Sequence, residues 1–230
     1  IGYMIERMLR NVLKKHNIQK EVVTIITQVI VDANDDAFDH PTKRVGKIYS
    51  KEEADKISRE KSWIFKEEVK VKGGWRRVVP SPKPVCIMNE NVVKTLAEQG
   101  NIVVAAGGGG VPVYIDENNN IRPAEAVIDK DLASSLLAEQ IGADEFYILT
   151  DVPYVYLNYN TSEQKIAEFL NYKDTVKYLE EGQFAEGSMD PKIHACLNFI
   201  RKGGKKSVIT EAFKLEDKNY GTKITMEYED

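Results

Sequence analysis

Residues 101–139 read NIVVAAGGGGVPVYIDENNNIRPAEAVIDKDLASSLLAE, and the interpretation of the whole chain depends on this stretch. The apolar run 102–106 predicts a short buried strand that leads into glycine. Residues 107–110 are all glycine, so the backbone there can adopt positive φ and another group can approach it closely. Residues 111–115 form a second apolar run, and Asp129 begins an amphipathic helix further on.

The residues after the glycines exclude two well-known phosphate-binding motifs. A Walker loop needs Gly-Lys-Ser/Thr at the start of a helix, and a dinucleotide fingerprint also needs a helix directly after its glycines. Here Pro112 follows Gly110 by two residues and a strand-like run continues. The pattern is therefore strand, glycine turn, strand. The glycines alone leave two readings open, an anion-binding nest of backbone N–H groups and a tight or bulged turn.

Lys130 is the second unusual feature, because it follows the predicted N-cap Asp129 and so occupies the first position of a helix. A cation there opposes the helix dipole, typically by ~0.3–1 kcal/mol. Asp129 and Asp131 can compensate that charge. Alternatively, a phosphate held between Lys130 and the glycine turn compensates it.

Residues 187–192, Gly-Ser-Met-Asp-Pro-Lys, repeat the arrangement. Asp190 is the expected N-cap, Pro191 the first helical residue and Lys192 the second. Two lysines, each at a helix start beside glycine, indicate a site for phosphoryl transfer, which needs positive charge and N–H donors around the transferred group.

The composition limits the classes of function. The chain has 230 residues, of which 42% are hydrophobic, and this allows one substantial core or two lobes that share a sheet. A net charge of −4 argues against nucleic-acid binding, and we find no apolar run of the ~18–20 residues that a membrane span needs. Cys86 and Cys196 form no CxxC pair and fit a reducing compartment.

The hydrophobic pattern predicts alternating helices and strands. We expect helices at 1–13, 50–61, 89–99, 130–141, 162–169, 171–181 and 190–202, and strands at 22–31, 65–71, 75–79, 102–106, 111–115, 145–149, 155–157, 207–210 and 222–226. This order is typical of an α/β fold with a mainly parallel sheet that is covered on both faces. Residues 38–75 carry many charges and few large apolar side chains, so they form either a small subdomain or a plain surface insertion.

Six short motifs then occur in a fixed order: His-Pro-Thr-Lys at 40–43, Trp-Arg-Arg-Val-Val-Pro-Ser-Pro at 75–82, Gly-Gly-Gly-Gly-Val-Pro at 107–112, Ala-Val-Ile-Asp-Lys-Asp-Leu-Ala at 126–133, Ile-Leu-Thr-Asp-Val at 148–152 and Gly-Ser-Met-Asp-Pro-Lys at 187–192. Their combination and order resemble the carbamate kinases, a branch of the amino-acid kinase superfamily. The resemblance runs through the whole chain.

The resemblance implies both a fold and a reaction. The fold is the α/β amino-acid kinase fold, a mainly parallel sheet sandwiched by helices in three layers. Residues 1–37 and 76–230 would form this core, and 38–75 a protruding lid subdomain. The reaction is reversible phosphoryl transfer, in which ATP and carbamate exchange with ADP and carbamoyl phosphate. It commonly makes ATP at the end of arginine deiminase fermentation.

The resemblance also implies the roles of individual residues. Lys130 and Lys192 would contact the transferring phosphoryl group, Asp131 would orient them, and Lys43 would belong to the lid. The nucleotide would be lined by Thr150, Asp151, Val152, Tyr156, Gly187, Ser188 and Met189. The substrate and phosphate side would be formed by Gly107, Gly108 and Gly109.

Cofactors and partners follow from the same resemblance. We expect ATP or ADP as the nucleotide and carbamate or carbamoyl phosphate as the small-molecule partner of a cytoplasmic homodimer. The sequence shows no carboxylate cluster for a dedicated metal site, so Mg²⁺ is expected to arrive with the nucleotide and to keep several waters.

The chain departs from the family at its start. Residues 1–13 have the apolar spacing of a helix, but no cap and no initiator methionine, so we expect a piece of a longer protein. The family's N-terminal strand and its glycine-glycine-asparagine loop would lie upstream of Ile1. Residues 65–74 also lack the usual acidic and glycine-arginine pattern. Another acyl or amino-acid kinase, such as an acetylglutamate kinase relative, and a non-catalytic nucleotide-binding module stay open as alternatives.

Overall fold

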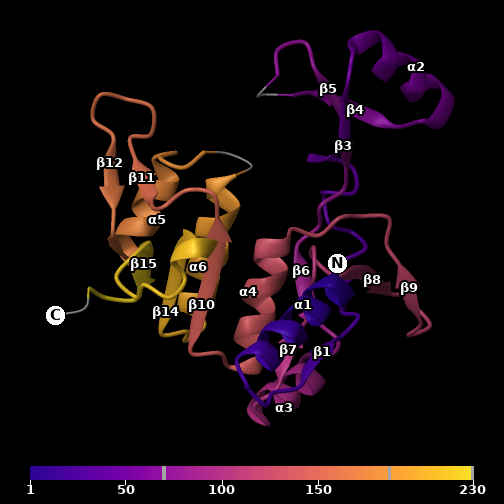
Figure 1. The fold of residues 1–230 in the computed structure, drawn as a ribbon. Helices are drawn as coiled ribbons and strands as arrows, with labels where there is room; N and C mark the ends of the chain where they lie inside the picture. Colours follow the sequence, from indigo (N-terminus) through magenta and orange to yellow (C-terminus); the bar gives the residue numbers. More distant parts are fainter. Residues whose placement is uncertain (69–70, 186–187, 229–230) are drawn as a thin grey trace.

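The computed structural model describes residues 1–68, 71–185 and 188–228 (Figure 1). Within these ranges the helices are α1 (Gly2–Lys15), α2 (Lys51–Lys61), α3 (Glu90–Glu98), α4 (Lys130–Ile141), α5 (Tyr172–Glu180) and α6 (Met189–Arg201), with a short 3-10 helix at Ala212–Lys214. The strands are β1 (Val22–Thr24), β2 (Gln28–Val31), β3 (Lys43–Tyr49), β4 (Ile64–Glu67), β5 (Trp75–Val79), β6 (Pro84–Ile87), β7 (Ile102–Val104), β8 (Val111–Ile115), β9 (Ile121–Pro123), β10 (Glu145–Thr150), β11 (Val155–Leu157), β12 (Lys165–Ala167), β13 (Phe169–Asn171), β14 (Lys206–Glu211) and β15 (Thr222–Thr225).

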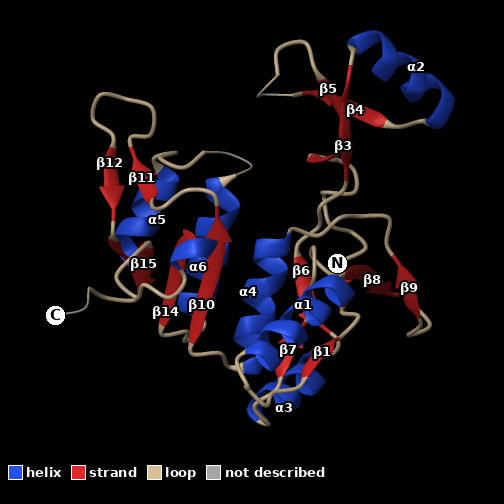
Figure 2. Cartoon of the chain, in the orientation of Figure 1, coloured by secondary structure: helices blue, strands red, loops and turns tan. Residues whose placement is uncertain are grey.

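These strands form several small sheets that divide the molecule into two halves and a projecting part (Figures 1 and 2). The N-terminal half contains the pair β1-β7 and the sheet β6-β2-β8-β9. The C-terminal half contains the sheet β10-β14-β15-β13 and the pair β11-β12. Parallel pairing joins β1 to β7, β2 to β8, β10 to β14 and β13 to β15, while the other pairs are antiparallel. The expected α/β class is therefore present, as mixed sheets with helices packed on them.

Each half has its own hydrophobic core. The N-terminal core consists of the buried side chains of Val29, Val31, Ile87, Val93, Ala106, Ile128, Ala133 and Leu137. The C-terminal core is larger and includes Phe146, Ile148, Val155, Leu170, Ile193, Phe199, Ile200, Ile209 and Ile224.

Helix α4 lies between the two halves and belongs to both cores (Figure 1). Ala133 and Leu137 pack in the N-terminal core, whereas Leu132 and Ala138 pack against the C-terminal core. The sequence predicts an amphipathic helix here, but the structure buries α4 on two sides. A helix with apolar residues around most of its circumference is buried in this way.

Strands β3, β5 and β4 form an antiparallel sheet that, together with α2, stands apart from both halves (Figure 1). We call these four elements, from Lys43 to Val79, the projecting unit. Helix α2 begins at the expected place with a capping box, in which Ser50 and Glu53 exchange hydrogen bonds between side chain and backbone. Aromatic and cationic side chains make up much of its packing, and the Arg77 guanidinium lies 3.8 Å from the Trp63 ring centroid.

Two sequence-based element predictions are wrong. Residues 22–31 were expected as one strand, but they form β1 and β2 in different sheets, because the chain turns between Ile25 and Thr27 to change partners. Residues 162–169 were expected as a helix, but they contribute β12 and part of β13. Pairing of β12 with β11 and of β13 with β15 outweighs the helix propensity of a segment rich in Glu, Gln, Lys and Ala.

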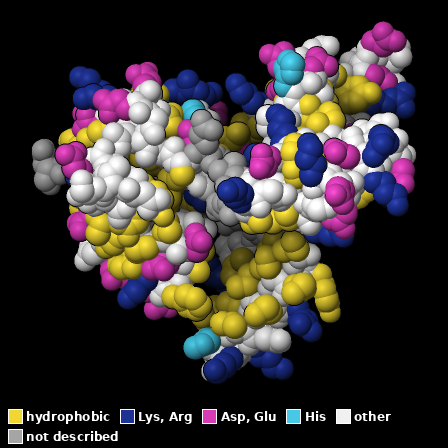
Figure 3. All heavy atoms as spheres, turned by 90° about the horizontal axis from the view of Figure 1, so that it is seen from above, with side chains coloured by type: hydrophobic (Ala, Val, Ile, Leu, Met, Phe, Trp, Pro, Cys, Tyr) yellow, Lys and Arg dark blue, Asp and Glu magenta, His cyan; other side chains and the backbone are white. Residues whose placement is uncertain are grey.

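The surface carries hydrophobic side chains that gather in the view of Figure 3. The exposed hydrophobic side chains at the start of the chain include those of Ile1 and, on α1, of Tyr3, Met4, Met8 and Val12. None of the helices in the described residues has the length and apolar content required to span a membrane. Both cysteines are free thiols, Cys196 buried and Cys86 partly exposed.

A hydrogen bond between α4 and α6 offers a test of their packing. The Ser135 hydroxyl donates to the Ala195 carbonyl oxygen at 2.7 Å, and the Ser135 residue is 2% exposed. We expect Ser135→Ala to lower the free energy of unfolding by about 1 kcal/mol, the usual net value of one such bond. Urea unfolding measures the loss. Ser134→Ala is the matched control, because this partly exposed neighbour on the same helix makes no side-chain hydrogen bond among the residues that the structure describes. An equal loss in both variants would contradict a specific role for Ser135.

Candidate active site

The site is built where α4 and α6 begin. The two helices pack side by side and run in the same direction, since residue 131 contacts 192 and residue 135 contacts 195. Figure 1 shows their N-terminal ends on the same side of the molecule, facing the projecting unit. Two helix N-termini next to each other bring their positive dipole ends together, and this favours an anion.

The start of α4 is as the sequence predicts. Asp129 is the N-cap, and its carboxylate accepts hydrogen bonds from the backbone N–H groups of Asp131 and Leu132. Lys130 is therefore the first residue of the helix, and the helix ends at Gly142 in the left-handed conformation. This local geometry places both residues in the first turn, with the side chain of Lys130 exposed and that of Asp131 buried.

The start of α6 corrects the sequence analysis. Asp190 was expected as the N-cap, but the helix begins at Met189 and its N-cap is Ser188, whose side chain makes no capping hydrogen bond. Pro191 lies within the first turn, where a missing N–H costs no helical hydrogen bond. As a result Lys192 belongs to the fourth helical position, one turn inside α6.

Asp131 holds two of the lysines. The Lys192 ammonium lies 2.8 Å from its Oδ2 atom, and the Lys130 ammonium lies 3.2 Å from the same atom. The side chains of Lys192 and Asp131 are 13% and 10% exposed, whereas that of Lys130 is 59% exposed. Lys192 is thus a nearly buried cation with a fixed partner, and Lys130 is free to reach solvent or a ligand.

Lys43 of the projecting unit reaches the same place. Its ammonium lies 2.6 Å from Oδ2 of Asp129, and their side chains are 35% and 13% exposed. Burial raises the pKa of Asp129, but the hydrogen bond and charge of Lys43 and the two backbone N–H groups outweigh it, so the pKa is lowered overall. Across these ion pairs three lysines face two aspartates, which leaves excess positive charge at the two helix ends.

The glycine turn lies against the start of α4. Gly109 is buried with a φ of +129°, and a Cβ atom there would lie 2.3 Å from the carbonyl oxygen of Ile128, the residue before Asp129. Gly110 has a φ of +81°, and a Cβ atom there would lie 2.4 Å from Cγ2 of Val29 and 3.0 Å from the carbonyl oxygen of Thr27. The close approach that the sequence predicts for these glycines is therefore made with the chain's own backbone.

Thr27 holds the turn in place, and the sequence analysis missed it. Its buried hydroxyl accepts a hydrogen bond from the Ala106 N–H at 2.8 Å, and its carbonyl oxygen accepts one from the Val111 N–H at 2.8 Å. Nothing in a run of β-branched residues distinguishes this threonine from an ordinary strand residue.

Gly107 and Gly108 are exposed on the outer side of the turn. Together with Gly110 they line a surface cavity of about 360 Å³, which also includes Gly2 and Ile5 of α1 and Ile26. Of the three glycines expected on the substrate side, Gly107 and Gly108 border open space, whereas Gly109 packs on α4.

The residues expected around the nucleotide lie in the C-terminal half. Thr150 ends β10, and its hydroxyl donates to Asp151 at 3.1 Å. Tyr156 is in β11, with its ring centroid 6.1 Å from that of Tyr159. Val152 follows in the partly buried turn between these strands.

The second group of nucleotide residues leads into α6. Ser188 is exposed at the start of the helix, Met189 packs against the C-terminal core, and Gly187 lies outside the described residues. Residues 150–156 thus lie at the carboxyl end of β10, and residues 188–189 lie at the start of α6.

Neither a reactive cysteine nor a metal site is added to the lysines by the residues that the structure describes. Burial raises the pKa of the Cys196 thiol to about 12, so this α6 residue does not supply a thiolate at neutral pH. In the part of the chain that the structure describes, no three His, Cys, Asp or Glu side chains gather in a way that would hold a metal ion.

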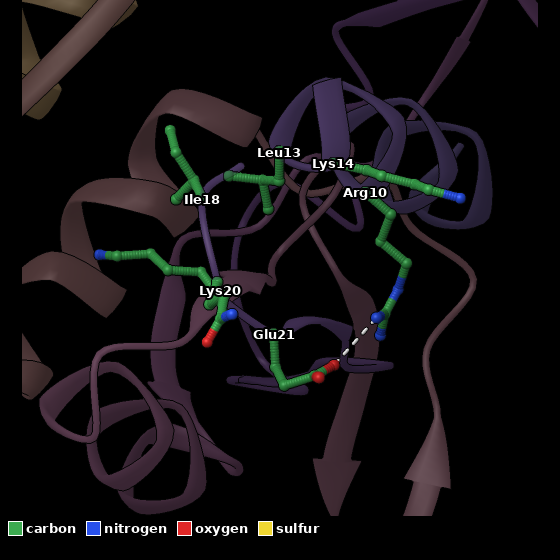
Figure 4. A pocket seen from close by; sticks show the side chains of 7 residues that line it. Arg10, Leu13, Lys14, Ile18, Lys20 and Glu21 are labelled. Carbon is green, nitrogen blue, oxygen red and sulfur yellow. Dashed lines mark hydrogen bonds and ion pairs between the residues drawn. The ribbon is translucent and has the colours of Figure 1, made fainter. Parts of the chain in front are cut away.

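Another cavity, of about 410 Å³, lies between α1 and the segment before β1 (Figure 4). It is lined by Arg10, Leu13, Lys14, Ile18, Gln19, Lys20 and Glu21. Its Arg10 guanidinium is 2.9 Å from the Glu21 carboxylate. None of these lining residues belongs to the lysine cluster, by which we mean Lys43, Lys130 and Lys192.

Comparison with known proteins gives consistent results. Residues 3–211 match the amino acid kinase family. Carbamate kinase from Pyrococcus horikoshii is 49% identical to this chain, and the match covers 98% of this chain and 72% of the relative's length. Carbamate kinase from Pyrococcus furiosus is 50% identical, and the match covers 93% of this chain and 67% of that relative's length. The crystal structure of Giardia lamblia carbamate kinase bound to AMP-PNP is 38% identical, has a TM-score of 0.85, and aligns over 97% of this chain and 71% of that one.

The glycine turn offers a test of the site's backbone geometry. We expect Gly110→Ala to lower the free energy of unfolding by about 1–3 kcal/mol, as overpacking usually does, because its Cβ would lie 2.4 Å from Cγ2 of Val29. Gly108→Ala is the matched control. Its Cβ meets nothing within 4 Å and its φ is not positive, so the change should stay within about 0.5 kcal/mol. Equal stability of the two variants in urea unfolding would contradict the packing described here.

The lysine cluster, the glycine turn and the projecting unit occur together in a chain whose matches extend over almost its full length. The identities exceed what a shared fold alone requires, and the family match includes Lys43, Lys130 and Lys192 within its range. The chain belongs to the amino acid kinase family and, within it, to the carbamate kinases.

Proposed function

We propose that this site transfers a phosphoryl group reversibly between ATP and carbamate, so that carbamoyl phosphate and ADP are the other pair of reactants. The observation that carries the proposal is the position of Lys130, Asp131 and Lys192 at two adjacent helix N-termini. Phosphoryl transfer demands positioning and charge stabilisation from a protein and little covalent chemistry.

Lys192 is the fixed charge of the site. Because its side chain is held by Asp131 and is only 13% exposed, it needs no rearrangement when negative charge is redistributed on the phosphoryl oxygens. Lys130 is the adaptable charge, since its side chain is mostly exposed and its attachment to Asp131 is longer. Asp131 therefore organises both lysines and does not act as a base. Carbamate is already anionic, so its oxygen has no proton to lose before it attacks phosphorus.

The nucleotide fits the C-terminal half. Residues 150–156 follow the carboxyl end of β10, which is parallel to β14, and ligands of α/β sheets commonly bind at that end. The base and ribose would lie along Thr150, Asp151, Val152 and Tyr156 and beside Ser188, with the phosphates directed toward Lys192. Gly107 and Gly108 would face the carbamate side, while Gly109 holds the turn against Ile128.

Mg²⁺ fits this site as a partner of the nucleotide. When bound, it would neutralise charge on the phosphate oxygens, and it would keep several waters as magnesium usually does. The residues that approach the phosphate position are lysines and N–H groups, which bind phosphate oxygens and not the metal.

The larger assembly is part of the same proposal. The core would adopt the family's three-layer arrangement of helices around its sheets, and residues 38–75, which include most of the projecting unit, would act as a lid that carries Lys43. A cytoplasmic location is in keeping with the two free cysteines, and a homodimer is what the resemblance to the family implies.

A coupled assay tests the reaction. ATP formed from carbamoyl phosphate and ADP is detected with hexokinase and glucose-6-phosphate dehydrogenase. In a separate reaction N-acetylglutamate is offered with ATP as the competing acceptor, and the ADP formed is detected with pyruvate kinase and lactate dehydrogenase. We expect turnover with carbamoyl phosphate and none with N-acetylglutamate. Turnover with N-acetylglutamate and none with carbamoyl phosphate would exclude carbamate as the acceptor.

Lys192→Ala tests the fixed charge. We expect kcat to fall by about 10²–10³-fold, the usual cost of one group that stabilises transition-state charge, with the Kd for ADP nearly unchanged. The matched control is Lys202→Ala at the opposite end of α6, where Lys202 is 3.0 Å from Glu139 and 51% exposed. Steady-state kinetics and ADP titration measure both quantities. A near-normal kcat in Lys192→Ala would refute the role.

Asp131→Asn tests whether this residue is an organiser or a general base. An organiser lowers kcat when it loses its charge, but the pH at which the rate is half-maximal does not move. The pH–rate profile of kcat, compared with that of the wild type, distinguishes the two. A displaced acid limb, which a titrating base produces, would count against the organising role.

A further inference from the structure

We propose that Asp129 is a positioning residue, which tethers the projecting unit to the core and holds Lys43 at the N-terminus of α4. The proposal rests on the proposed function, because it assigns Asp129 a part in placing one of its lysines. The Asp129–Lys43 pair joins residues that are 86 positions apart in the chain.

The two oxygens of Asp129 serve two different partners. Oδ1 accepts the N–H groups of Asp131 at 2.9 Å and Leu132 at 3.2 Å, which caps α4. Oδ2 accepts the Lys43 ammonium at 2.6 Å. The cap fixes the orientation of the carboxylate, so its second oxygen points to one place, and Lys43 is bound there.

The location of the pair makes it a tether. Lys43 is the first residue of β3, where the chain enters the projecting unit, and Asp129 belongs to the core. The returning chain is attached nearby, since the Val127 N–H donates to the Pro80 carbonyl oxygen at 3.0 Å. In Figure 1 the projecting unit stands off both halves, so contacts at its base control its orientation.

The two carboxylates at the start of α4 bind different lysines. Asp131 holds Lys130 and Lys192, which belong to the core helices, and Asp129 holds Lys43, which belongs to the projecting unit. The two aspartates lie within the first turn of one helix, Asp129 as its N-cap and Asp131 as its second residue. A long lysine side chain loses conformational freedom when it is fixed, and Asp129 imposes that loss before any substrate arrives.

Asp129→Asn separates the tether from the cap. Asparagine is about as good an N-cap as aspartate, so α4 keeps its hydrogen bonds while the charge that binds Lys43 is removed. Asp116→Asn is the matched control. Asp116 is in the turn between β8 and β9, accepts two backbone N–H groups at 2.9 and 2.8 Å, and lies 2.7 Å from Arg122.

Tryptophan fluorescence reports on the tether without reference to activity. The chain has two tryptophans, Trp63 and Trp75, and both lie in the projecting unit. We expect the time-resolved anisotropy of the wild type and Asp116→Asn to decay with the rotation of the whole molecule. In Asp129→Asn and in Lys43→Ala a faster component should appear. The same decay in Asp129→Asn as in the wild type would overturn the tether.

A double-mutant cycle tests whether Asp129 acts through Lys43. We expect Asp129→Asn to lower kcat about tenfold or more in the wild type and less than about twofold in the Lys43→Ala background, as coupled residues do. An equal loss in both backgrounds, or no loss in the wild type, would overturn the positioning role. If the wild type does not turn over carbamoyl phosphate, the proposed function fails, and the tether is then judged on the anisotropy alone.

Discussion

The burial of Lys192 beside Asp131 is the constraint on which the rest of the site depends. A nearly buried ammonium is tolerated only with a close anionic partner, and removing one member of such a pair commonly costs ~3–5 kcal/mol. That partner comes from another helix, so α4 and α6 must start side by side and stay in register. The Ser135–Ala195 hydrogen bond and the apolar contacts between the helices maintain the register. Packing of helices therefore sets the position of charge, and charge in turn limits how the helices can pack.

The sequence predicted most of the elements because their signals are local. The helix start at residue 50, the Asp129 N-cap and the helix end at residue 141 all depend on residues within one helical turn, and the structure contains each of them. The failures have tertiary causes. Residues 162–169 favour a helix by propensity but pair with β11 and β15, and Asp190-Pro191 has the pattern of a helix start although α6 begins earlier. The apolar residues of α4 are spread around the helix, in agreement with its burial on two sides, but the elements that surround it cannot be identified from those residues.

The candidate site was predictable to the extent that its residues form motifs. Lys130, Asp131 and Lys192 follow from helix-start patterns and from the family resemblance, and the structure brings them together around one carboxylate. Thr27 and the second role of Asp129 were not predictable. Thr27 resembles any strand threonine, and the partner of Asp129 lies far away in the chain. Long-range pairing of this kind requires the fold itself.

The shared helix α4 also limits how this protein can be recombined. Its Ala133 and Leu137 match one half of the molecule, while Leu132 and Ala138 match the other. A chimera that exchanges either half with a relative therefore inherits a helix of which only one side fits. Such a chimera needs an α4 in which the side chains that face each half come from the same parent as that half. The N-terminal and C-terminal halves are thus not modules in the genetic sense, although each has its own sheets and its own core.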